Sequence, residues 1–410
     1  MRILHTADWH LGKRLGPVDR ADDLNRAVDR VMTYCEQENV DVLLIAGDLF
    51  DTKKRFEDIC AAIDHLKESA RPFLSRGGTI LATTGNHDSE TTCKAIQHVL
   101  SLADPSSIDF GNLLPSGRFY LATRPTFYRL ADRSGHEVQF VLMPYPLPSR
   151  YLDDAVTSYQ GGAEGKNRRL REEFSGTLAR MRAHAKFNPS LHSVLVAHLF
   201  LQGATLPGGY VITQEHEKSD VVCPSEDLGA GWAYVALGHI HMPQQLGGCS
   251  HVRYSGSIER LDFDEREDEK GVVLFEVGSD GRRGEPTWLP LESTSFLNVS
   301  IQNPSEEIPR LELDYPNAAQ AIVRCEVRLT PGVDDQDEIH RRLNQVFPRC
   351  YQRVFIKPTL PDSASSSSIH LAGRSLRETV FDYLRSRLEG HPNEEAVLAE
   401  AEALIAEVHP

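Results

Sequence analysis

Short apolar segments alternate with helical patterns over the first 200 residues of the chain. Five segments are rich in aliphatic and β-branched residues and stop at a glycine or a polar residue, which is typical of buried strands. They are RILHT (2–6), DVLLIAG (41–47), TILATTG (79–85), VQFVLM (138–143) and SVLVAH (193–198). Between the first two, apolar residues from Leu24 to Cys35 recur at helical spacing, and weaker helical patterns cover 55–70, 91–102 and 166–186. Alternating strands and helices predict a layered α/β domain.

From residue 232 onward the strand signals follow one another with little helix between them. They are WAYVALG (232–238), HVRYSG (251–256) and GVVLFEV (271–277), and they suggest a second, more antiparallel sheet. The fold class predicted for residues 1–285 is therefore α/β, a two-sheet sandwich flanked by helices.

Three further units are predicted beyond residue 285. Residues 286–357 hold two strand patterns around a helical one and predict a small α/β cap domain. Residues 358–370 contain two prolines and a run of four serines, the composition of a flexible linker. Residues 371–410 read as a helical hairpin. About forty residues bury too little apolar surface to stand alone, so the hairpin needs a surface to dock on, either its own domain or a partner protein.

Composition places the chain among ordinary globular proteins. Its 410 residues are 40% hydrophobic and 25% charged, and the formal net charge is −15, which works against a polyanionic substrate unless cations or local basic patches intervene.

The seven cysteines are odd in number and show no CxxC pair, which argues against a disulfide framework and a thiolate zinc site. The chain shows neither a secretory signal nor a membrane span, so we expect a cytoplasmic protein.

Side chains that can bind metals directly follow five of the predicted strands. Because ligands of open α/β sheets bind outside the carboxyl ends of the strands, we expect these residues to converge although they run from residue 8 to residue 241. They are Asp8 and His10 after the first strand, Asp48 and Asp51 after the second, Asn86 and His87 after the third, His198 at the end of 193–198, and His239 and His241 after 232–238.

These donors exceed what one tetrahedral ion needs, and a shared carboxylate would let them hold two ions. Mixed oxygen and imidazole donors fit Mn²⁺, Fe²⁺ or Zn²⁺ better than Mg²⁺ or Ca²⁺. Each fragment alone has a plainer explanation: Asp48 could cap a helix, and His198 could be a satisfied core histidine. Five such fragments, every one at a strand end, favour a dinuclear metal site.

The fragments DWH, GDLFD, GNHD, AHL and GHIH, in this order, resemble the motif set of the calcineurin-like metallophosphoesterases. More narrowly, HTADWHLG, AGDLFDT, GNHDS, YVALGHIHMPQ and VRYSGS resemble the SbcD family, the nuclease subunits of bacterial SbcCD DNA-repair complexes. The motifs cover residues 1–285, and beyond them the similarity is one of layout.

The resemblance implies a role for each matching residue. One Mn²⁺ would be held by Asp8, His10, Asp48 and His241, and Asp48 would bridge to a second Mn²⁺ held by Asn86, His198 and His239. His87 would be the catalytic histidine, which stabilises the transition state or protonates the leaving oxygen, and Asp51 would orient it. Some relatives carry His at the position of Asp51.

Two basic clusters lie beside these motifs. Lys13 and Arg14 follow the first ligand pair, while Lys53, Lys54 and Arg55 follow the second. Any one lysine is more often solvated surface charge, but the shared position beside predicted ligands favours contact with a phosphate backbone.

The resemblance implies a manganese-dependent nuclease that trims DNA ends 3′ to 5′ and opens single-stranded or hairpin DNA during double-strand break repair and recombination. It also implies a homodimer, a DNA-contacting cap, and an ATPase partner that receives residues 371–410. Two alternatives stay open: a metallophosphoesterase acting on a small phosphodiester or a phosphoprotein, and a metal-dead scaffold protein. The presence of every predicted ligand argues against the scaffold.

Overall fold

The computed structural model describes residues 1–51, 56–102, 110–152, 160–356, 381, 384–385 and 396–402. The chain forms two compact units, Met1–Ile356 and Lys357–Pro410. Most of the predicted linker and helical hairpin, 358–410, lies outside the described residues; within it, 396–402 are helical.

The first sheet of the larger unit has six strands. Their order is β18 (Gly281–Leu291), β17 (Lys270–Gly278), β1 (Arg2–Thr6), β4 (Val42–Ala46), β5 (Thr79–Thr83) and β6 (Phe119–Ala122). Strands β1, β4, β5 and β6 are parallel, whereas β17 and β18 are antiparallel. The central strands β4 and β5 are buried throughout, as expected of a parallel sheet covered on both faces.

The second sheet also has six strands. Their order is β15 (Gln244–Leu246), β16 (Cys249–Tyr254), β14 (Tyr234–Gly238), β9 (Ser193–His198), β8 (Glu137–Met143) and β7 (Thr126–Ala131). The expected antiparallel character is wrong for its centre, because β16, β14, β9 and β8 are mutually parallel and only the two edge strands run antiparallel. Strand β17, expected in this sheet, instead pairs with β1 of the first sheet.

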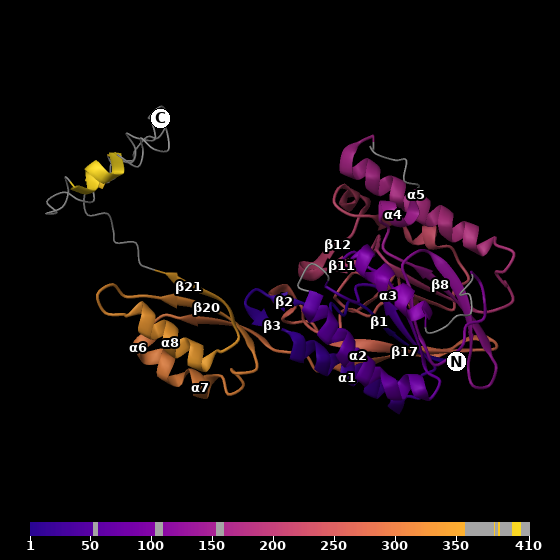
Figure 1. Cartoon of the computed structure of the whole chain (residues 1–410), viewed down its shortest axis with the longest axis horizontal. Helices are drawn as coiled ribbons and strands as arrows, with labels where there is room; N and C mark the ends of the chain where they lie inside the picture. Colours follow the sequence, from indigo (N-terminus) through magenta and orange to yellow (C-terminus); the bar gives the residue numbers. More distant parts are fainter. Residues whose placement is uncertain are drawn as a thin grey trace. The chain divides into compact units, whose positions relative to one another are not determined.

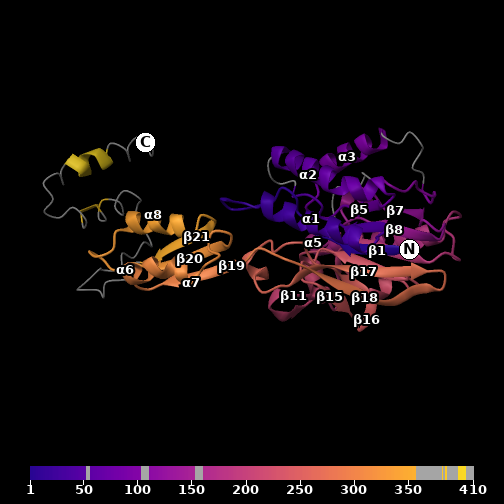
Figure 2. The same ribbon diagram turned by 90° about the horizontal axis from the view of Figure 1, so that it is seen from below.

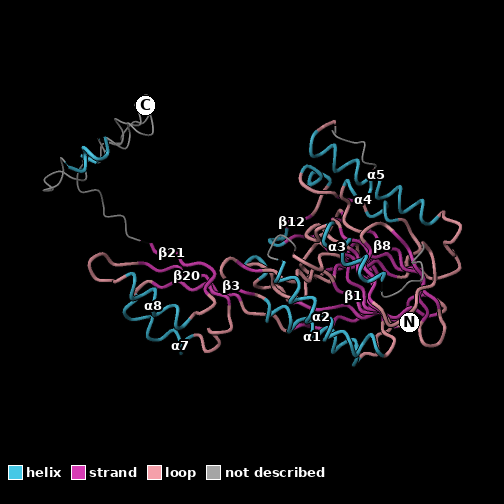
Figure 3. The backbone as a smooth tube through the Cα atoms, in the orientation of Figure 1, coloured by secondary structure: helices cyan, strands magenta, loops and turns pink. Residues whose placement is uncertain are grey.

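The two sheets pack face to face between helices, so the predicted two-sheet sandwich is confirmed (Figures 1 and 2). Residues such as Leu44, Phe140 and Tyr234 fill the space between the sheets. The outer face of the first sheet packs on α1 (Ala21–Gln37) and α2 (Phe56–Ser75), with α3 (Glu90–Leu102) beside them, and the second packs on α4 (Pro148–Tyr151) and α5 (Gly162–Arg182). The tube view shows these helices outside the strands (Figure 3).

A three-stranded parallel sheet follows, made of β19 (Phe296–Ile301), β20 (Ile322–Arg328) and β21 (Cys350–Ile356). It packs on α6 (Pro304–Glu307), α7 (Leu311–Asp314) and α8 (Gln336–Val346) around its own core, which includes Val323 and Leu343. Strand β18 runs past the boundary expected at residue 285, because its partner β17 extends the first sheet that far.

The remaining elements are short. They are β2 (Arg14–Leu15), β3 (Val18–Asp19), β10 (Phe200–Leu201), β11 (Thr205–Leu206), β12 (Tyr210–Val211), β13 (Val222–Cys223), and the 3-10 helices η1 (Pro207–Gly209), η2 (Gln214–Lys218), η3 (Ser225–Leu228), η4 (Phe263–Glu265) and η5 (Ile308–Arg310). All seven cysteines are free thiols. Within the described residues, none of the helices has the length and apolarity that crossing a bilayer requires.

Candidate metal centre

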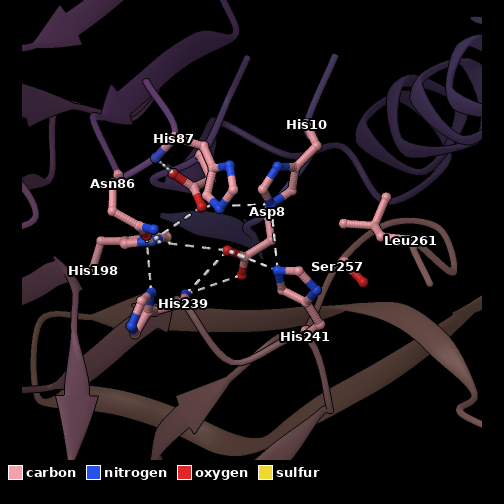
Figure 4. A network of polar contacts seen from close by, with 12 residues as sticks. Asp8, His10, Asn86, His87, His198, His239, His241, Ser257 and Leu261 are labelled. Carbon is pink, nitrogen blue, oxygen red and sulfur yellow. Dashed lines mark hydrogen bonds and ion pairs between the residues drawn. The ribbon is translucent and has the colours of Figure 1, made fainter. Parts of the chain in front are cut away.

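Five strands, three from the first sheet and two from the second, deliver polar side chains to one place (Figure 4). In the first sheet these residues follow β1, β4 and β5, and in the second they end or follow β9 and β14. Strands β4 and β5 pair in parallel, as do β9 and β14, so their carboxyl ends meet at one edge. The structure therefore brings together all seven predicted ligands: Asp8, His10, Asp48, Asn86, His198, His239 and His241.

The backbone at this edge is held in an unfavourable conformation. Asp8, His10, Asp48 and His239 have positive φ angles of 53°, 46°, 50° and 98°. Among the described non-glycine residues, only Asn39 shares this property. Each such conformation costs on the order of 1–3 kcal/mol and persists where surrounding structure enforces it, commonly at functional sites. The strain thus coincides with the predicted metal ligands.

Two glycines make room for the cluster. A Cβ on Gly47 would lie 2.1 Å from Nδ1 of His198, and one on Gly85 would lie 2.1 Å from Oδ1 of Asp48. Asp88 then ties the two loops together, because its carboxylate accepts hydrogen bonds from the backbone N–H groups of Leu49, Phe50 and Gly85. The loops after β4 and β5 are thus locked against each other beside the centre.

One half of the centre is formed by Asp8, His10 and His241, with Asp48 at its border. The Nε2 atoms of His10 and His241 lie 3.3 Å apart, and Oδ1 of Asp8 lies 3.9 Å from Nε2 of His241. Oδ2 of Asp48 lies 3.4 Å from Nε2 of His10. Donor atoms at these separations surround a point that one cation could occupy.

The other half is formed by Asn86, His198 and His239, again with Asp48 at its border. Oδ1 of Asn86 lies 3.1 Å from Nε2 of His198 and 3.0 Å from Nδ1 of His239. Oδ2 of Asp48 lies 3.5 Å from Nε2 of His198. Since the same oxygen of Asp48 approaches His10 as well, its carboxylate stands between the two halves.

Burial and charge together make the centre suitable for cations. Burial favours a neutral carboxyl, yet the attraction of His198 holds the pKa of Asp48 well below its usual range. Burial lowers the pKa of His198, but Asp48, Asp8 and the Ala46 carbonyl together raise it to about 9. Burial keeps the pKa of His10 well below its usual value, so its ring is neutral. Carboxylates and imidazoles that converge in a buried site fit two divalent ions of the Mn²⁺, Fe²⁺ or Zn²⁺ type.

His87 lies beside this donor set, as predicted for the catalytic histidine. Its backbone N–H donates to Oδ1 of Asp48 at 2.7 Å, and its ring centroid lies 4.7 Å from that of His10 in an edge-on arrangement. Asp51 is buried, its backbone N–H donates to the Leu11 carbonyl, and its Oδ1 has no hydrogen-bond partner among the described residues. The orientation of His87 by Asp51 stays a prediction.

The first basic cluster lies next to the centre. The backbone N–H of Lys13 donates to the His10 carbonyl, and Lys13 and Arg14 line a small cavity with Leu11. Arg14 forms an ion pair with Asp19 at 2.5 Å. The second cluster, Lys53, Lys54 and Arg55, lies outside the described residues.

Four further residues contact the outer faces of the predicted ligands. The sequence analysis did not predict a role for any of them. Asp220 and Tyr145 stand behind His239, and Glu265 and Lys270 stand behind His241. No local signal marks them, because none of the four follows a motif glycine at the end of a strand, and only tertiary packing brings them to the histidines.

Residues 1–243 match the family described as "Calcineurin-like phosphoesterase". The chain belongs to this family. The match covers all five strands that deliver the clustered side chains, and it agrees with the two-sheet sandwich.

Several curated relatives are named as SbcD-type components of the nuclease SbcCD. The one from Bacillus subtilis is 28% identical over 358 residues, 83% of this chain and 82% of the relative. The one from Escherichia coli K12 is 28% identical over 322 residues, 74% of this chain and 70% of the relative. The one from Rhodobacter capsulatus is 30% identical over 287 residues, 68% of this chain and 66% of the relative. The chain is thus similar to these nuclease components well beyond its catalytic motifs.

Proposed function

We propose that this protein is a metal-dependent DNA nuclease that cleaves phosphodiester bonds at a dinuclear centre. The observation that carries the proposal is the Asp48 carboxylate, which stands between two groups of donors and approaches His10 and His198 with one oxygen, at 3.4 and 3.5 Å. The similarity to components of the nuclease SbcCD supports DNA as the substrate.

The chain's own residues would divide the work. Asp8, His10, Asp48 and His241 would hold one ion, and Asn86, His198 and His239 would hold the other with Asp48 as the bridge. Two such ions supply a water of lowered pKa and neutralise charge on the phosphate. His87, which adjoins His10, would donate a proton to the leaving 3′ oxygen or stabilise charge on the phosphate.

The proposed ions are Mn²⁺, which the family resemblance implies, or Fe²⁺ or Zn²⁺ in its place, because mixed oxygen and imidazole donors suit all three. The expected activities are 3′–5′ exonuclease action on DNA ends and endonuclease action on single strands and hairpins. The deciding experiment incubates the purified chain and Mn²⁺ with single-stranded, double-stranded and hairpin DNA, beside the His87→Ala variant. Cleavage that disappears in the variant supports the proposal, whereas cleavage unchanged in the variant contradicts it.

The basic clusters would hold the DNA backbone. Lys13 and Arg14 border the loop of His10, and Lys53, Lys54 and Arg55 follow Asp48 in sequence. Replacement of Lys53 and Lys54 by Glu is expected to weaken DNA cleavage while sparing hydrolysis of a small phosphodiester. Equal losses on both substrates would show that the lysines act on the centre rather than on DNA.

Residues 371–410 would dock on an SbcC-type ATPase. Similarity to components of SbcCD and the expected helical hairpin support this partner. Deletion of 371–410 is expected to abolish binding to the ATPase and to leave Mn²⁺ binding intact; retained ATPase binding would refute the assignment. With DNA and this ATPase as partners, the protein would act in the cytoplasm, in double-strand break repair and recombination, with the cap, residues 286–357, contacting DNA.

A homodimer is proposed through α2 and α3. Phe56 on α2 is 64% exposed, and Val99 and Leu102 on α3 are 66% and 82% exposed, which is unusual for large apolar side chains on two neighbouring helices. Substitution of Val99 and Leu102 by Asp is expected to convert a dimer to a monomer in light scattering. A wild-type chain that is monomeric at micromolar concentration would contradict the proposal.

A further inference from the structure

The four histidines of the centre differ in what holds the ring nitrogen that points away from it. Nδ1 of His198 lies 2.7 Å from the Ala46 carbonyl, and Nδ1 of His10 is buried without a hydrogen-bond partner among the described residues. His239 and His241 instead face a carboxylate each. A carboxylate in this position fixes the tautomer and the orientation of a ligating imidazole and makes it a stronger donor.

Behind His239 stands Asp220, which precedes β13. Its Oδ2 lies 3.1 Å from Nε2 of His239, while Nδ1 of the same ring faces Asn86. The Tyr145 hydroxyl donates to Oδ1 of Asp220 at 2.5 Å, and the backbone N–H of Val221 donates to the same oxygen. Both carboxylate oxygens are therefore engaged. No lysine or arginine among the described residues forms an ion pair with Asp220.

Behind His241 stands Glu265, in η4. Its Oε1 lies 2.7 Å from Nδ1 of His241, and its Oε2 accepts from Nζ of Lys270 at 2.7 Å and from the Ser257 hydroxyl. Lys270 has a fully buried side chain and also donates to the His241 carbonyl. Its ammonium group offsets the charge of Glu265 at close range and also pairs with Asp268 at 3.2 Å.

The outer carboxylates behind the two halves differ in their cation partners. Oδ1 of Asp8 lies 3.9 Å from Nε2 of His241 and 4.0 Å from Nε2 of His198, and the outer Glu265 has Lys270 as its cation partner. Asn86 is uncharged, and the outer Asp220 keeps its charge. Of the two outer carboxylates, Asp220 is thus the one without a lysine or arginine partner among the described residues.

We propose that Asp220 is a positioning residue of the metal centre, which fixes the ring of His239 and thereby makes that ring a stronger donor to the ion held by Asn86, His198 and His239. The inference rests on the proposed function, because it presumes that this centre binds two ions. Loss of such an outer carboxylate lowers metal affinity about 10–100-fold.

The test is a double-mutant cycle on the full-length chain, with binding of Mn²⁺ followed by calorimetry. Asp220→Asn keeps an oxygen for His239 and removes only the charge. Asp220→Asn is expected to weaken one of the two Mn²⁺-binding events about tenfold or more. The double variant Asp220→Asn/His239→Ala is expected to bind Mn²⁺ as well as His239→Ala alone. The matched variant is Glu265→Gln, behind His241. It is expected to lower Mn²⁺ affinity by the same factor in the wild type and in His239→Ala, because Glu265 and His239 act on different ions.

The outcomes separate the two claims. A wild-type chain that binds no Mn²⁺ refutes the proposed function itself. A wild-type chain that binds two ions, with Asp220→Asn binding both equally well, refutes the role of Asp220 alone, and so do additive effects of Asp220→Asn and His239→Ala. Thermal unfolding in EDTA, expected to be equal for wild type and Asp220→Asn, serves as the folding control. If Asp220→Asn fails to fold, Asp220→Ser, which also lacks the charge and keeps an oxygen, is carried through the same cycle with the same expectations.

Discussion

Asp48 and His198 form an ion pair that joins the two sheets, with Oδ2 of Asp48 lying 3.5 Å from Nε2 of His198. Asp48 follows β4 of the first sheet, and His198 is the last residue of β9 in the second. Burial lowers the pKa of His198, but Asp48, together with Asp8 and the Ala46 carbonyl, raises that pKa to about 9. In the metal-free protein His198 is therefore protonated at neutral pH, although a metal ligand must be deprotonated.

This pair predicts that metal binding releases a proton. Between pH 7 and pH 9 the affinity for Mn²⁺ should rise with pH, by about tenfold per unit for each proton displaced, and should level off above pH 9. Calorimetry in two buffers of different ionisation enthalpy measures the protons released. Heats that are identical in both buffers at pH 7 would show that His198 is already neutral.

In EDTA, the contribution of this ion pair to the stability of the metal-free fold falls as the pH rises, whereas the affinity for Mn²⁺ increases. A histidine whose pKa is raised in the folded state stabilises the fold fully below its ordinary value near 6.5, and that contribution is lost as the pH rises toward 9. Urea unfolding of the metal-free protein should therefore show the wild type losing stability from pH 6.5 to pH 9 relative to His198→Gln. Parallel pH profiles of the two proteins would contradict this expectation.

Replacement of His87 should separate chemistry from metal binding. His87→Ala removes a ring beside the donor set while its backbone N–H still reaches Asp48, so the ions should be retained and hydrolysis should fall about 10²–10⁴-fold. Asp48→Ala should lose both ions. The metal content after dialysis and hydrolysis of a small phosphodiester measure the two effects. The exposed His98 offers a control, since His98→Ala should change neither.

Gly85 should tolerate no side chain. A Cβ there would lie 2.1 Å from Oδ1 and 2.5 Å from the backbone N of Asp48, so Gly85→Ala should displace the predicted bridging carboxylate. We expect a loss of about 1–3 kcal/mol in the free energy of unfolding together with weaker Mn²⁺ binding. Gly176→Ala in α5 is the control, expected to stabilise by about 0.5–1 kcal/mol. Unchanged Mn²⁺ binding in Gly85→Ala would place Asp48 outside the centre.

Asp23 should hold the three-stranded domain against the sandwich. The buried carboxylate accepts hydrogen bonds from Arg20 at 2.6 Å and from Arg349, next to β21, at 3.1 Å. Arg349→Met should increase protease cleavage between β18 and β19 and lower stability. Asp23→Asn should cost about 1–3 kcal/mol, because Arg20 loses one of its two buried carboxylates and keeps Glu259. Arg26 binds the Asp23 carboxylate with a side chain that is 66% exposed, so Arg26→Met should cost under about 1 kcal/mol. Equal effects of the two arginine variants would contradict this role.

The sequence predicted the features that depend on a short run of neighbouring residues, such as the strand ends and the side chains that follow them. An apolar run that stops at Gly47 or Gly85 and continues with Asp48 or Asn86 carries both the strand and its ligand in one segment, so the strand ends were identified directly. The pairing of strands that are far apart in sequence has no such local signal. Nothing within residues 271–277 specifies that β17 pairs with β1 rather than with β16.

The same limit explains the outer residues of the centre. Asp220 and Glu265 reach His239 and His241 from segments whose positions are set by packing of the whole second sheet, and their sequence surroundings resemble ordinary polar loops. Helix ends were also inexact. Helix α2 continues to Ser75 past the expected end near residue 70 and includes Pro72, because its buried face, with Ala70 and Phe73, packs on the first sheet.

The division of donors between the two sheets has a thermodynamic consequence. Asp8 and Asp48 belong to one sheet, and His198 and His241 belong to the other, so neither sheet can bind the ions tightly by itself. An ion that binds only when the two sheets are packed together adds its binding free energy to the free energy needed to separate the sheets. Metal would then act as a clamp across the sandwich interface, and chelation would loosen the protein at its centre rather than at its periphery.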